Sequence, residues 1–309
     1  MAPVGAEVIL VTGTDDGYLP LIWVVARSAA RRLRPPHRLA FHVLYRGSDA
    51  AMVARLQKLR VPNLRVVVHP IDGRLDALQG EGRLPVLTYA RLLIPELLPT
   101  TSRAIYVDPD VLVREDLGAL FDTDLAGRAI GAVPDVPQFL PPRELSHPRF
   151  TGTWQAYCEG VLGLPYAPDW LGYVNAGVLL LDLDRLRSLN FSHRTLAWAL
   201  DMRDRTVWHD QDAINATFCD EITLVDARWN VIPSAIMGPR AGQAPVLDLI
   251  DRQRARQAIV HFAGGDKPWK RLTPFAQSWW VTAAFTPAFS AGMSRLATKQ
   301  AALDIFRSR

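Results

Sequence analysis

Short apolar runs alternate with longer amphipathic stretches along the first part of the chain. The short runs, which predict strands, are Glu7–Thr12, Arg38–Tyr45 and Asn63–Val68. The stretches between them, which have apolar residues at helical spacing, are Leu19–Arg34 and Ser48–Leu59. This alternation predicts an α/β fold with a Rossmann-like, mostly parallel central sheet and helices on both faces.

The predicted helices carry recognisable start and stop signals. A proline pair follows Arg34, and Ser48 is the expected cap of the second helix. A third predicted helix, Thr88–Leu98, ends before a proline and is followed by the strand Arg103–Val107. Asp15 and Asp108 both fall just after predicted strands. Ligands of open parallel sheets bind beyond the carboxyl ends of the strands, so function is expected at these two aspartates.

The second half of the chain is less regular. Residues 135–170 are rich in proline and aromatic side chains, which predicts a long excursion of the kind that often forms binding loops. The predicted strands after it are Val174–Asp182 and Ala258–Phe262, and the predicted helices are Leu196–Arg203 and Gln211–Phe218.

The segment from Leu272 to Met293 contains no charged residue and many aromatic ones. Its prolines, Gln277 and several hydroxyl side chains make it a poor membrane span. We favour a terminal helical segment that packs on the body of the protein. The alternative is a weak interfacial anchor, in which basic residues farther along face lipid phosphates; these are Arg295, Lys299, Arg307 and Arg309.

The composition of the 309 residues is that of a globular protein, with 49% hydrophobic and 21% charged residues. The net charge is +4, and the basic residues are scattered rather than gathered in a stripe, which argues against nucleic acid as a partner. Cys158 and Cys219 are too few for a disulfide framework or a thiolate metal site. The first residues lack the pattern of a signal peptide, so the expected location is the cytoplasm, or the inner face of the membrane if the anchor forms.

Two carboxylates, Asp108 and Asp110, interrupt the apolar run from Ile105 to Val113. Paired carboxylates beside a core strand repel each other and lose hydration, and a divalent cation between them offsets both costs. Pro109 should bend the strand and open the site. Asp-Pro-Asp is equally good turn chemistry, and these residues alone do not decide between the two interpretations.

Three further segments carry polar residues at the ends of apolar strands or at a helix start. His261 is followed by Gly264 and Lys267; imidazole suits Mn²⁺, and glycine and lysine suit a phosphate. Taken alone, this segment is more often a strand end with a satisfied histidine and a surface lysine. Asn175 lies at the mouth of an apolar strand and needs polar partners, such as a sugar hydroxyl or a backbone group. Asp210 begins a helix and suits either a cap or a sugar contact.

Six segments together resemble the glycosyltransferases of family 8, of the glycogenin and lipopolysaccharide α-galactosyltransferase type. In chain order they are TDDGY at 14–18, TYARL at 88–92, IYVDPDVLVREDLGALFDTDL at 105–125, YVNAGVLLLDL at 173–183, HDQDAIN at 209–215 and HFAGGDKPW at 261–269. The resemblance implies a GT-A fold with one nucleotide-sugar-binding catalytic domain over residues 1–271. That domain includes an acceptor excursion at 135–172, and a helical segment at 272–309 follows it.

The resemblance also implies a role for each matching residue. Asp108, Asp110 and His261 would bind Mn²⁺, or Mg²⁺ in its place. The residues that would bind the donor, a UDP-sugar, are Thr14, Asp15, Asp16, Tyr18, Arg91, Asp108, Asn175, Ala176, Gly264 and Lys267. Gln211, Asp210 and Arg91 would act at the reacting carbon, with Gln211 stabilising an oxocarbenium-like transition state and the sugar transferred with retention.

Two other functions are weighed against this one. The first is a nucleotide-sugar-binding protein of the same fold with little transfer activity, although such a protein has no need to keep every residue of the set. The second is a nicotinamide-dependent dehydrogenase, which the lack of a G-x-G-x-x-G after the first strand disfavours. The sugar, galactose or glucose, and the acceptor, a carbohydrate or small molecule, stay open. Gly17 and Pro109 depart from the usual family pattern.

Overall fold

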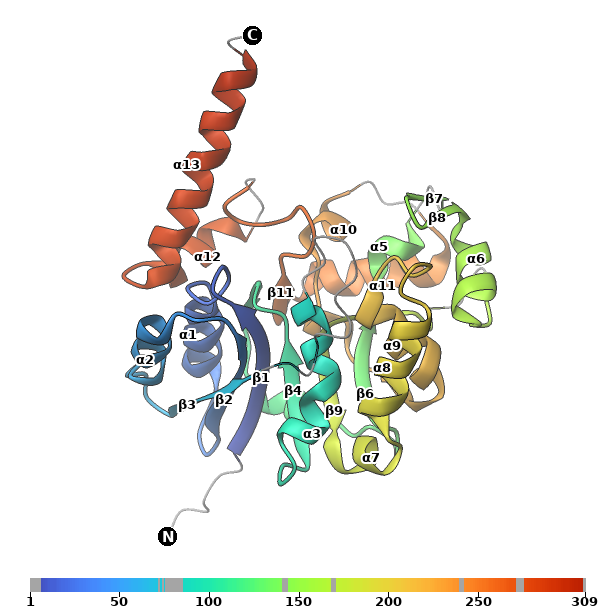
Figure 1. The fold of residues 1–309 in the computed structure, drawn as a ribbon, viewed down its shortest axis with the longest axis horizontal. Coiled ribbons are helices and arrows are strands. Elements are labelled where there is room, and N and C mark those ends of the chain that lie inside the picture. Colours follow the sequence, from blue (N-terminus) through green and yellow to red (C-terminus); the bar gives the residue numbers. More distant parts are fainter. Residues whose placement is uncertain are drawn as a thin grey trace.

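The structure is a computed structural model that describes residues 7–71, 73, 75, 86–140, 144–167, 171–238, 242–270 and 275–307, without the side chains of 86 and 298–307. A seven-stranded sheet with the order β10-β6-β9-β4-β1-β2-β3 forms its centre (Figure 1). The strands of this sheet are β1 (Glu7–Asp15), β2 (Arg38–Arg46), β3 (Leu64–Pro70), β4 (Arg103–Val107), β6 (Ile130–Pro134), β9 (Val174–Asp182) and β10 (Ile222–Leu224).

The central sheet is mostly parallel, as the sequence predicts. β1 pairs in parallel with β2 and with β4, β2 with β3, and β6 with β10. The exception is β9, which runs antiparallel to both β4 and β6. The chain leaves β3 at one edge and returns to pair β4 with β1, so the direction of winding changes between β1 and β4.

Helices cover both faces of the sheet. One face packs against α1 (Ile22–Arg32), α2 (Ala50–Gln57), α4 (Gly118–Phe121) and the C-terminal helices. The other packs against the 3₁₀ segment η2 (Val86–Leu93) and against α3 (Ile94–Leu97), α7 (Leu183–Ser188), α8 (Phe191–Asp201) and α9 (His209–Phe218). A third apolar cluster lies among α5 (Val136–Phe139), α6 (Trp154–Tyr157), the π-helical turn η3 (Cys158–Leu162), α10 (Pro233–Met237) and α11 (Ala244–Ala255).

Two small antiparallel sheets complete the fold. One pairs β5 (Val111–Val113) with β11 (Ile259–His261), and the other is the hairpin β7 (Glu144–His147) and β8 (Phe150–Thr153) within the excursion. Short 3₁₀ turns, η4 (Cys219–Glu221) and η5 (Ala227–Trp229), flank β10.

Several predicted boundaries are wrong for local physical reasons. The cap of α2 is Asp49 rather than Ser48, because the Asp49 side chain accepts from the backbone N–H of Met52 at 2.9 Å. The predicted helix Thr88–Leu98 is instead a 3₁₀ segment followed by one α-helical turn, and Pro95, which has no N–H, lies at the change. α8 begins at Phe191, earlier than its apolar spacing indicates.

The C-terminal segment contains two helices, of which the first packs on the body of the protein and the second extends away from it. α12 (Ala276–Ala283) lies on α1, with Trp279 only 1% exposed, and Arg27 of α1 donates to the backbone oxygens of Thr282 and Ala284 at 3.2 and 2.6 Å. α13 (Pro287–Arg307) starts beside α12 and points away from the body (Figure 1). The predicted boundary at 271/272 lies outside the described residues. Within the described ranges, no helix is long and apolar enough to cross a membrane.

Candidate active site

The change of winding direction between β1 and β4 places a cavity at the carboxyl ends of these two parallel strands. The cavity has a volume of about 200 Å³. Its lining comes from β1, η2 and the β4–β5 connection and consists of Gly13, Asp15, Tyr18, Leu87, Thr88, Arg91, Tyr106, Asp108, Pro109 and Asp110. This is where ligands bind in doubly wound sheets, and it is the position expected from the sequence.

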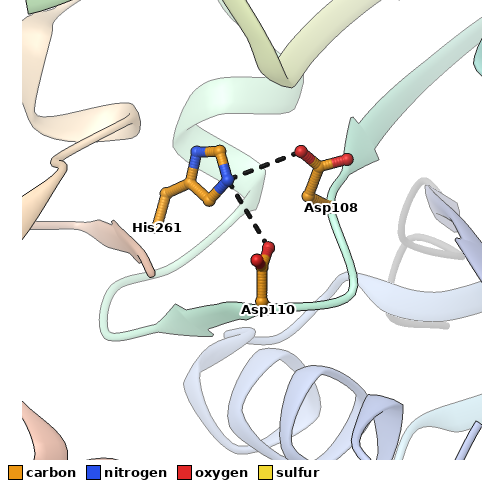
Figure 2. A group of neighbouring side chains, drawn as sticks. All are labelled: Asp108, Asp110 and His261. Carbon is orange, nitrogen blue, oxygen red and sulfur yellow. Dashed lines mark ion pairs between the residues drawn. The ribbon is translucent and has the colours of Figure 1, made fainter. Parts of the chain in front are cut away.

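Two side chains of the cavity wall, Asp108 and Asp110, converge with His261 as a metal site requires. His261 Nε2 lies 3.4 Å from Asp108 Oδ2 and 3.4 Å from Asp110 Oδ1 (Figure 2). One ligand atom from each residue falls within a 4.8 Å span. Where an ion is bound at about 2.1 Å from its ligand atoms, adjacent ligand atoms lie about 3 Å apart. The 3.4 Å separations between His261 Nε2 and the two carboxylate oxygens are close to that value.

The fold explains why three residues so far apart in sequence meet. Pro109 separates β4 from β5, so Asp108 ends one strand while Asp110 precedes a strand of a different sheet. In that second sheet His261 pairs with Val111, which sets the imidazole beside Asp110. Gly177 on β9 makes room, because a Cβ there would lie 2.1 Å from Cε1 of His261.

The electrostatics of the three residues fit a cation. Burial raises the carboxyl pKa of Asp108 and of Asp110. Nearby positive charges outweigh burial, so both pKa values lie below the usual carboxyl value. The charges come from Arg91 at Asp108, from Lys267 at Asp110 and from His261 at both. Burial lowers the pKa of His261, and hydrogen bonding to the two carboxylates outweighs this and raises it to about 9. Asp110 Oδ1 is buried, and the one polar contact found for it among the described residues is His261 Nε2 at 3.4 Å, which leaves it available as a ligand.

Asn230, which sequence analysis missed, fixes the orientation of His261. Its Oδ1 lies 3.1 Å from His261 Nδ1, so a proton on Nδ1 turns Nε2 toward the aspartates. The Asn230 amide nitrogen donates to Asn175 Oδ1 at 2.8 Å. No local pattern around Asn230 marks it, because its partners come from other elements.

The loop after β11 carries the predicted phosphate-binding residues. Lys267 is buried, and its Nζ contacts Asp110 Oδ2 and donates to the backbone oxygen of Phe262 at 2.7 Å. Gly264 has a left-handed φ of 52° and open space where a side chain would be. The lysine therefore lies against Asp110, beside the cluster of Asp108, Asp110 and His261.

Arg91 connects the metal ligands with the start of α9. Its guanidinium donates to Asp108 Oδ1 at 2.8 Å and lies 2.9 Å from Asp210 Oδ2. It also donates to the backbone oxygen of Ala176 at 2.5 Å. Burial raises the pKa of Asp210 to about 6 despite Arg91. The predicted residues Arg91, Asp108, Ala176 and Asp210 are thus brought into one buried network.

Gln211 and Asn175 share a partner that the sequence did not reveal, Asp135 at the end of β6. Asp135 Oδ2 accepts from Gln211 Nε2 at 2.8 Å, and Oδ1 accepts from Asn175 Nδ2 at 3.3 Å. Gln211 Oε1 accepts from the backbone N–H of Ala176 at 3.0 Å. Burial raises the pKa of Asp135 although these amides stabilise its charge.

Asp212 belongs to the framework under α9 rather than to the cavity wall. It is fully buried and accepts from the hydroxyls of Tyr157 at 2.6 Å and Tyr173 at 2.7 Å, and from the backbone N–H of Trp208 at 2.7 Å. Burial raises its pKa to about 6. Because Tyr173 also accepts from Gln211 Nε2 at 3.1 Å, this framework supports the Gln211 side chain.

The predicted nucleotide-binding residues differ in their surroundings. Asp15 and Tyr18 line the cavity, and Asp15 Oδ1 accepts from the Tyr18 N–H at 2.8 Å. Thr14 is buried, and its hydroxyl donates to the Asp15 backbone oxygen at 3.2 Å. Asp16 is exposed and accepts from the Tyr45 hydroxyl and from the N–H of Ser48, so it holds the turn after β2. Nucleotide contact by these residues stays a prediction.

Comparison with known proteins identifies the family to which this fold and site belong. The sequence model of glycosyl transferase family 8 matches residues 9–273, which is most of the chain, and the chain therefore belongs to this family. General stress protein A of Bacillus subtilis (strain 168) is 30% identical over 198 residues, 60% of this chain and 59% of that protein. Probable galacturonosyltransferase-like 9 of Arabidopsis thaliana is 24% identical over 275 residues, 84% of this chain and 66% of that protein.

Solved structures confirm the predicted GT-A fold. The galactosyltransferase LgtC, in complex with donor and acceptor sugar analogues, superposes with a TM-score of 0.72 at 26% identity, over 90% of this chain and 96% of that chain. The bifunctional glycosyltransferase WbbM in its apo form gives a TM-score of 0.78 at 22% identity, over 96% of this chain and 53% of that one. The chain thus matches LgtC over nearly its whole length, but only 59% of general stress protein A.

Proposed function

We propose that the protein transfers a hexose from a UDP-sugar to a hydroxyl of an acceptor, with retention of anomeric configuration and with Mn²⁺ as cofactor. One observation carries the proposal: Asp108, Asp110 and His261 converge at the switch point of the sheet, with Lys267 against them. Family membership and the likeness to LgtC support it.

The residues around the metal position would handle the leaving group. Asp108, Asp110 and His261 would hold Mn²⁺ through two carboxylate oxygens and an imidazole nitrogen, with Mg²⁺ as the alternative ion. The bound ion would neutralise charge that develops on the departing diphosphate. Lys267 would move from Asp110 to a diphosphate oxygen, and Gly264 would let the backbone approach the phosphates.

The neighbouring network would hold the sugar. Arg91 lies between Asp108 and Asp210 of α9, where donor hydroxyls would replace part of these contacts. Gln211 is held by Asp135 and Ala176, which pre-organises its side-chain carbonyl to face the reacting carbon. Asn175 would complete the sugar pocket. Positioning of this kind accounts for a large part of the rate of a group transfer.

The acceptor would bind along the excursion at 135–172. The hairpin β7–β8 reaches the start of α9, because Arg149 Nη1 donates to the Thr206 backbone oxygen at 3.1 Å and lies 3.2 Å from His209 Nδ1. His209 directly precedes Asp210. An acceptor on this hairpin would therefore lie next to the proposed sugar pocket.

Incubation with a small panel of UDP-sugars and Mn²⁺, followed by UDP release, tests the proposal. We expect one hexose donor, UDP-galactose or UDP-glucose, to be hydrolysed slowly without acceptor and faster with a sugar acceptor. Binding of a donor with no UDP release under any condition would instead favour the catalytically weak nucleotide-sugar-binding protein. If no donor is cleaved and none raises the melting temperature, the proposed function is wrong.

We further propose that the protein associates weakly with the inner face of a membrane through the C-terminal helices. Large apolar side chains are exposed there, namely Val281, Phe285, Phe289, Met293 and Leu296. Co-sedimentation with phosphatidylglycerol vesicles should fall for a Phe285→Ser variant, since exposed aromatic residues drive interfacial binding. Equal sedimentation of both proteins, or none by the wild type, would contradict the association.

A further inference from the structure

A line of aromatic rings connects the cavity with the root of the C-terminal helix. Tyr18, on the cavity wall, lies edge-on to Trp269 with 6.4 Å between ring centroids. Trp269 lies 5.3 Å from Trp279 of α12, and Trp279 meets Trp280 edge to face at 5.0 Å. Trp280 contacts Phe289 of α13 at 5.7 Å. Close-packed rings of this kind transmit displacements, so the cavity wall and α13 form one packed unit.

Arg295 of α13 binds the cavity end of this line. Its guanidinium carbon lies 4.9 Å from the centroid of the Tyr18 ring and 5.2 Å from that of the Trp269 ring. Its Nη2 donates to the backbone oxygen of Gly17 at 2.5 Å. A planar guanidinium can stack on rings and donate in its own plane at the same time, which a lysine ammonium cannot. Arg295 thus contacts Gly17 and Tyr18 on one loop and Trp269 on another.

The two loops are those that carry the predicted nucleotide and phosphate contacts. The first is the turn after β1, which contains Asp15 and Tyr18. The second follows β11 and contains Lys267, two residues before Trp269, with its Nζ on Asp110. These loops are far apart in sequence, and Arg295 contacts both.

We infer that Arg295 is a positioning residue for the nucleotide-sugar donor, which makes α13 a structural part of the donor site. The inference rests on the proposed function, because it takes a UDP-sugar as the ligand. Through its cation–π contacts with Tyr18 and Trp269, Arg295 holds the nucleotide side and the diphosphate side of the cavity at a fixed separation. Its contacts do not include Asp108, Asp110, His261 or Gln211, so its loss should weaken donor binding and leave the chemical step unchanged.

The test compares Arg295→Ala, Arg295→Lys and a control, Ser290→Ala, in the full chain. Ser290 is on the same helix and is exposed. UDP binding in Mn²⁺ is measured by calorimetry, and KM and kcat are measured with the active donor. Two cation–π contacts predict that Arg295→Ala weakens UDP binding and raises the donor KM about tenfold, with kcat within about twofold. Arg295→Lys should fall between, and Ser290→Ala should match the wild type.

Any other outcome would contradict either the positioning role of Arg295 or the proposed function. Equal UDP affinity of Arg295→Ala and Ser290→Ala would overturn the inference and leave the proposed function standing. A loss of kcat with an unchanged KM, or a lowered melting temperature for Arg295→Lys with its UDP affinity unchanged, would show that Arg295 only supports the fold. Absence of UDP binding by the wild type would overturn the proposed function itself.

Discussion

Asp110 and Asp135 are both buried in the same site, yet their carboxyl pKa values move in opposite directions. Burial raises the pKa of each. At Asp110 the charges of Lys267 and His261 outweigh burial, and the pKa falls below its usual value. At Asp135 the partners are mainly neutral amides, and burial prevails.

This difference divides the site into two halves. The charged half consists of Asp108, Asp110, His261 and Lys267, where opposite charges face each other and a cation and a diphosphate would bind. The hydrogen-bonded half consists of Asp135, Asn175, Gln211 and Asp212, where amides and hydroxyls satisfy the carboxylates. Neighbouring cations therefore set the direction of the pKa shift at Asp110, whereas burial sets it at Asp135.

The largest effect is expected in the charged half. Asp110→Asn keeps the shape of the side chain but removes a metal ligand and the partner of Lys267. Stabilisation of the leaving diphosphate should be lost, and donor turnover should fall on the order of a thousandfold. Asp122→Asn, at an exposed aspartate, is the control and should keep wild-type turnover. Undiminished turnover of Asp110→Asn would refute the metal assignment.

Arg91 joins the two halves, and its removal should cost stability. Arg91→Met leaves Asp108 and Asp210 as buried carboxylates without their shared cation. The free energy of unfolding should drop by about 3 kcal/mol or more, measured by urea denaturation. Arg65→Met breaks an exposed pair with Glu7 and should cost less than about 1 kcal/mol. Similar costs for the two variants would mean that the buried network is not stabilising.

The hydrogen-bonded half should show its raised pKa values in the pH dependence of stability. Burial raises the pKa of Asp212 in the folded protein from its usual 3.8 to about 6. A raised carboxyl pKa stabilises the fold below the unfolded pKa, and this contribution is lost as pH rises through 6. The advantage of the wild type over Asp212→Asn should therefore shrink by about 2–3 kcal/mol between pH 4 and pH 7. Urea denaturation at both pH values measures it, and a constant difference would contradict the raised pKa.

The smallest effect is expected from disturbing Gln211 through its partner. Asp135→Asn replaces one acceptor by a donor that faces the amide of Gln211 or Asn175. One unmade buried hydrogen bond costs about 1–2 kcal/mol, so kcat should fall about tenfold while the donor KM changes little. Gln138→Ala removes a weaker contact of the same carboxylate, at 3.4 Å, and serves as the control. Equal kcat values for the two variants would exclude a role of Asp135 in positioning Gln211.

The charged half was largely predictable from sequence, and the hydrogen-bonded half only in part. Asp108 and Asp110 lie beside an apolar strand, but turn chemistry was an equally good interpretation of them, and the resemblance to family 8 is what grouped them with His261. Asp135 and Asn230 lie outside the segments that carry the resemblance. Their partners lie on other elements, and only the packing of β6 and η5 against β9 and β11 brings them together.

The fold, too, was predictable from the sequence only in part. The parallel strands β1 to β4 follow from apolar runs of ordinary length. The antiparallel direction of β9 was not predicted, because a fully apolar strand carries no sign of its direction. η2 was predicted as an α-helix, since 3₁₀ and α-helical segments share much of their apolar spacing.

Calorimetric titration of UDP into the protein, once with Mn²⁺ and once with EDTA, tests the central claim most directly. If the charged half holds a metal that bridges to the diphosphate, UDP will bind with Mn²⁺ and will bind far more weakly, or not at all, with EDTA. Equal UDP affinity in Mn²⁺ and in EDTA would show that Asp108, Asp110 and His261 do not form a metal site for the donor.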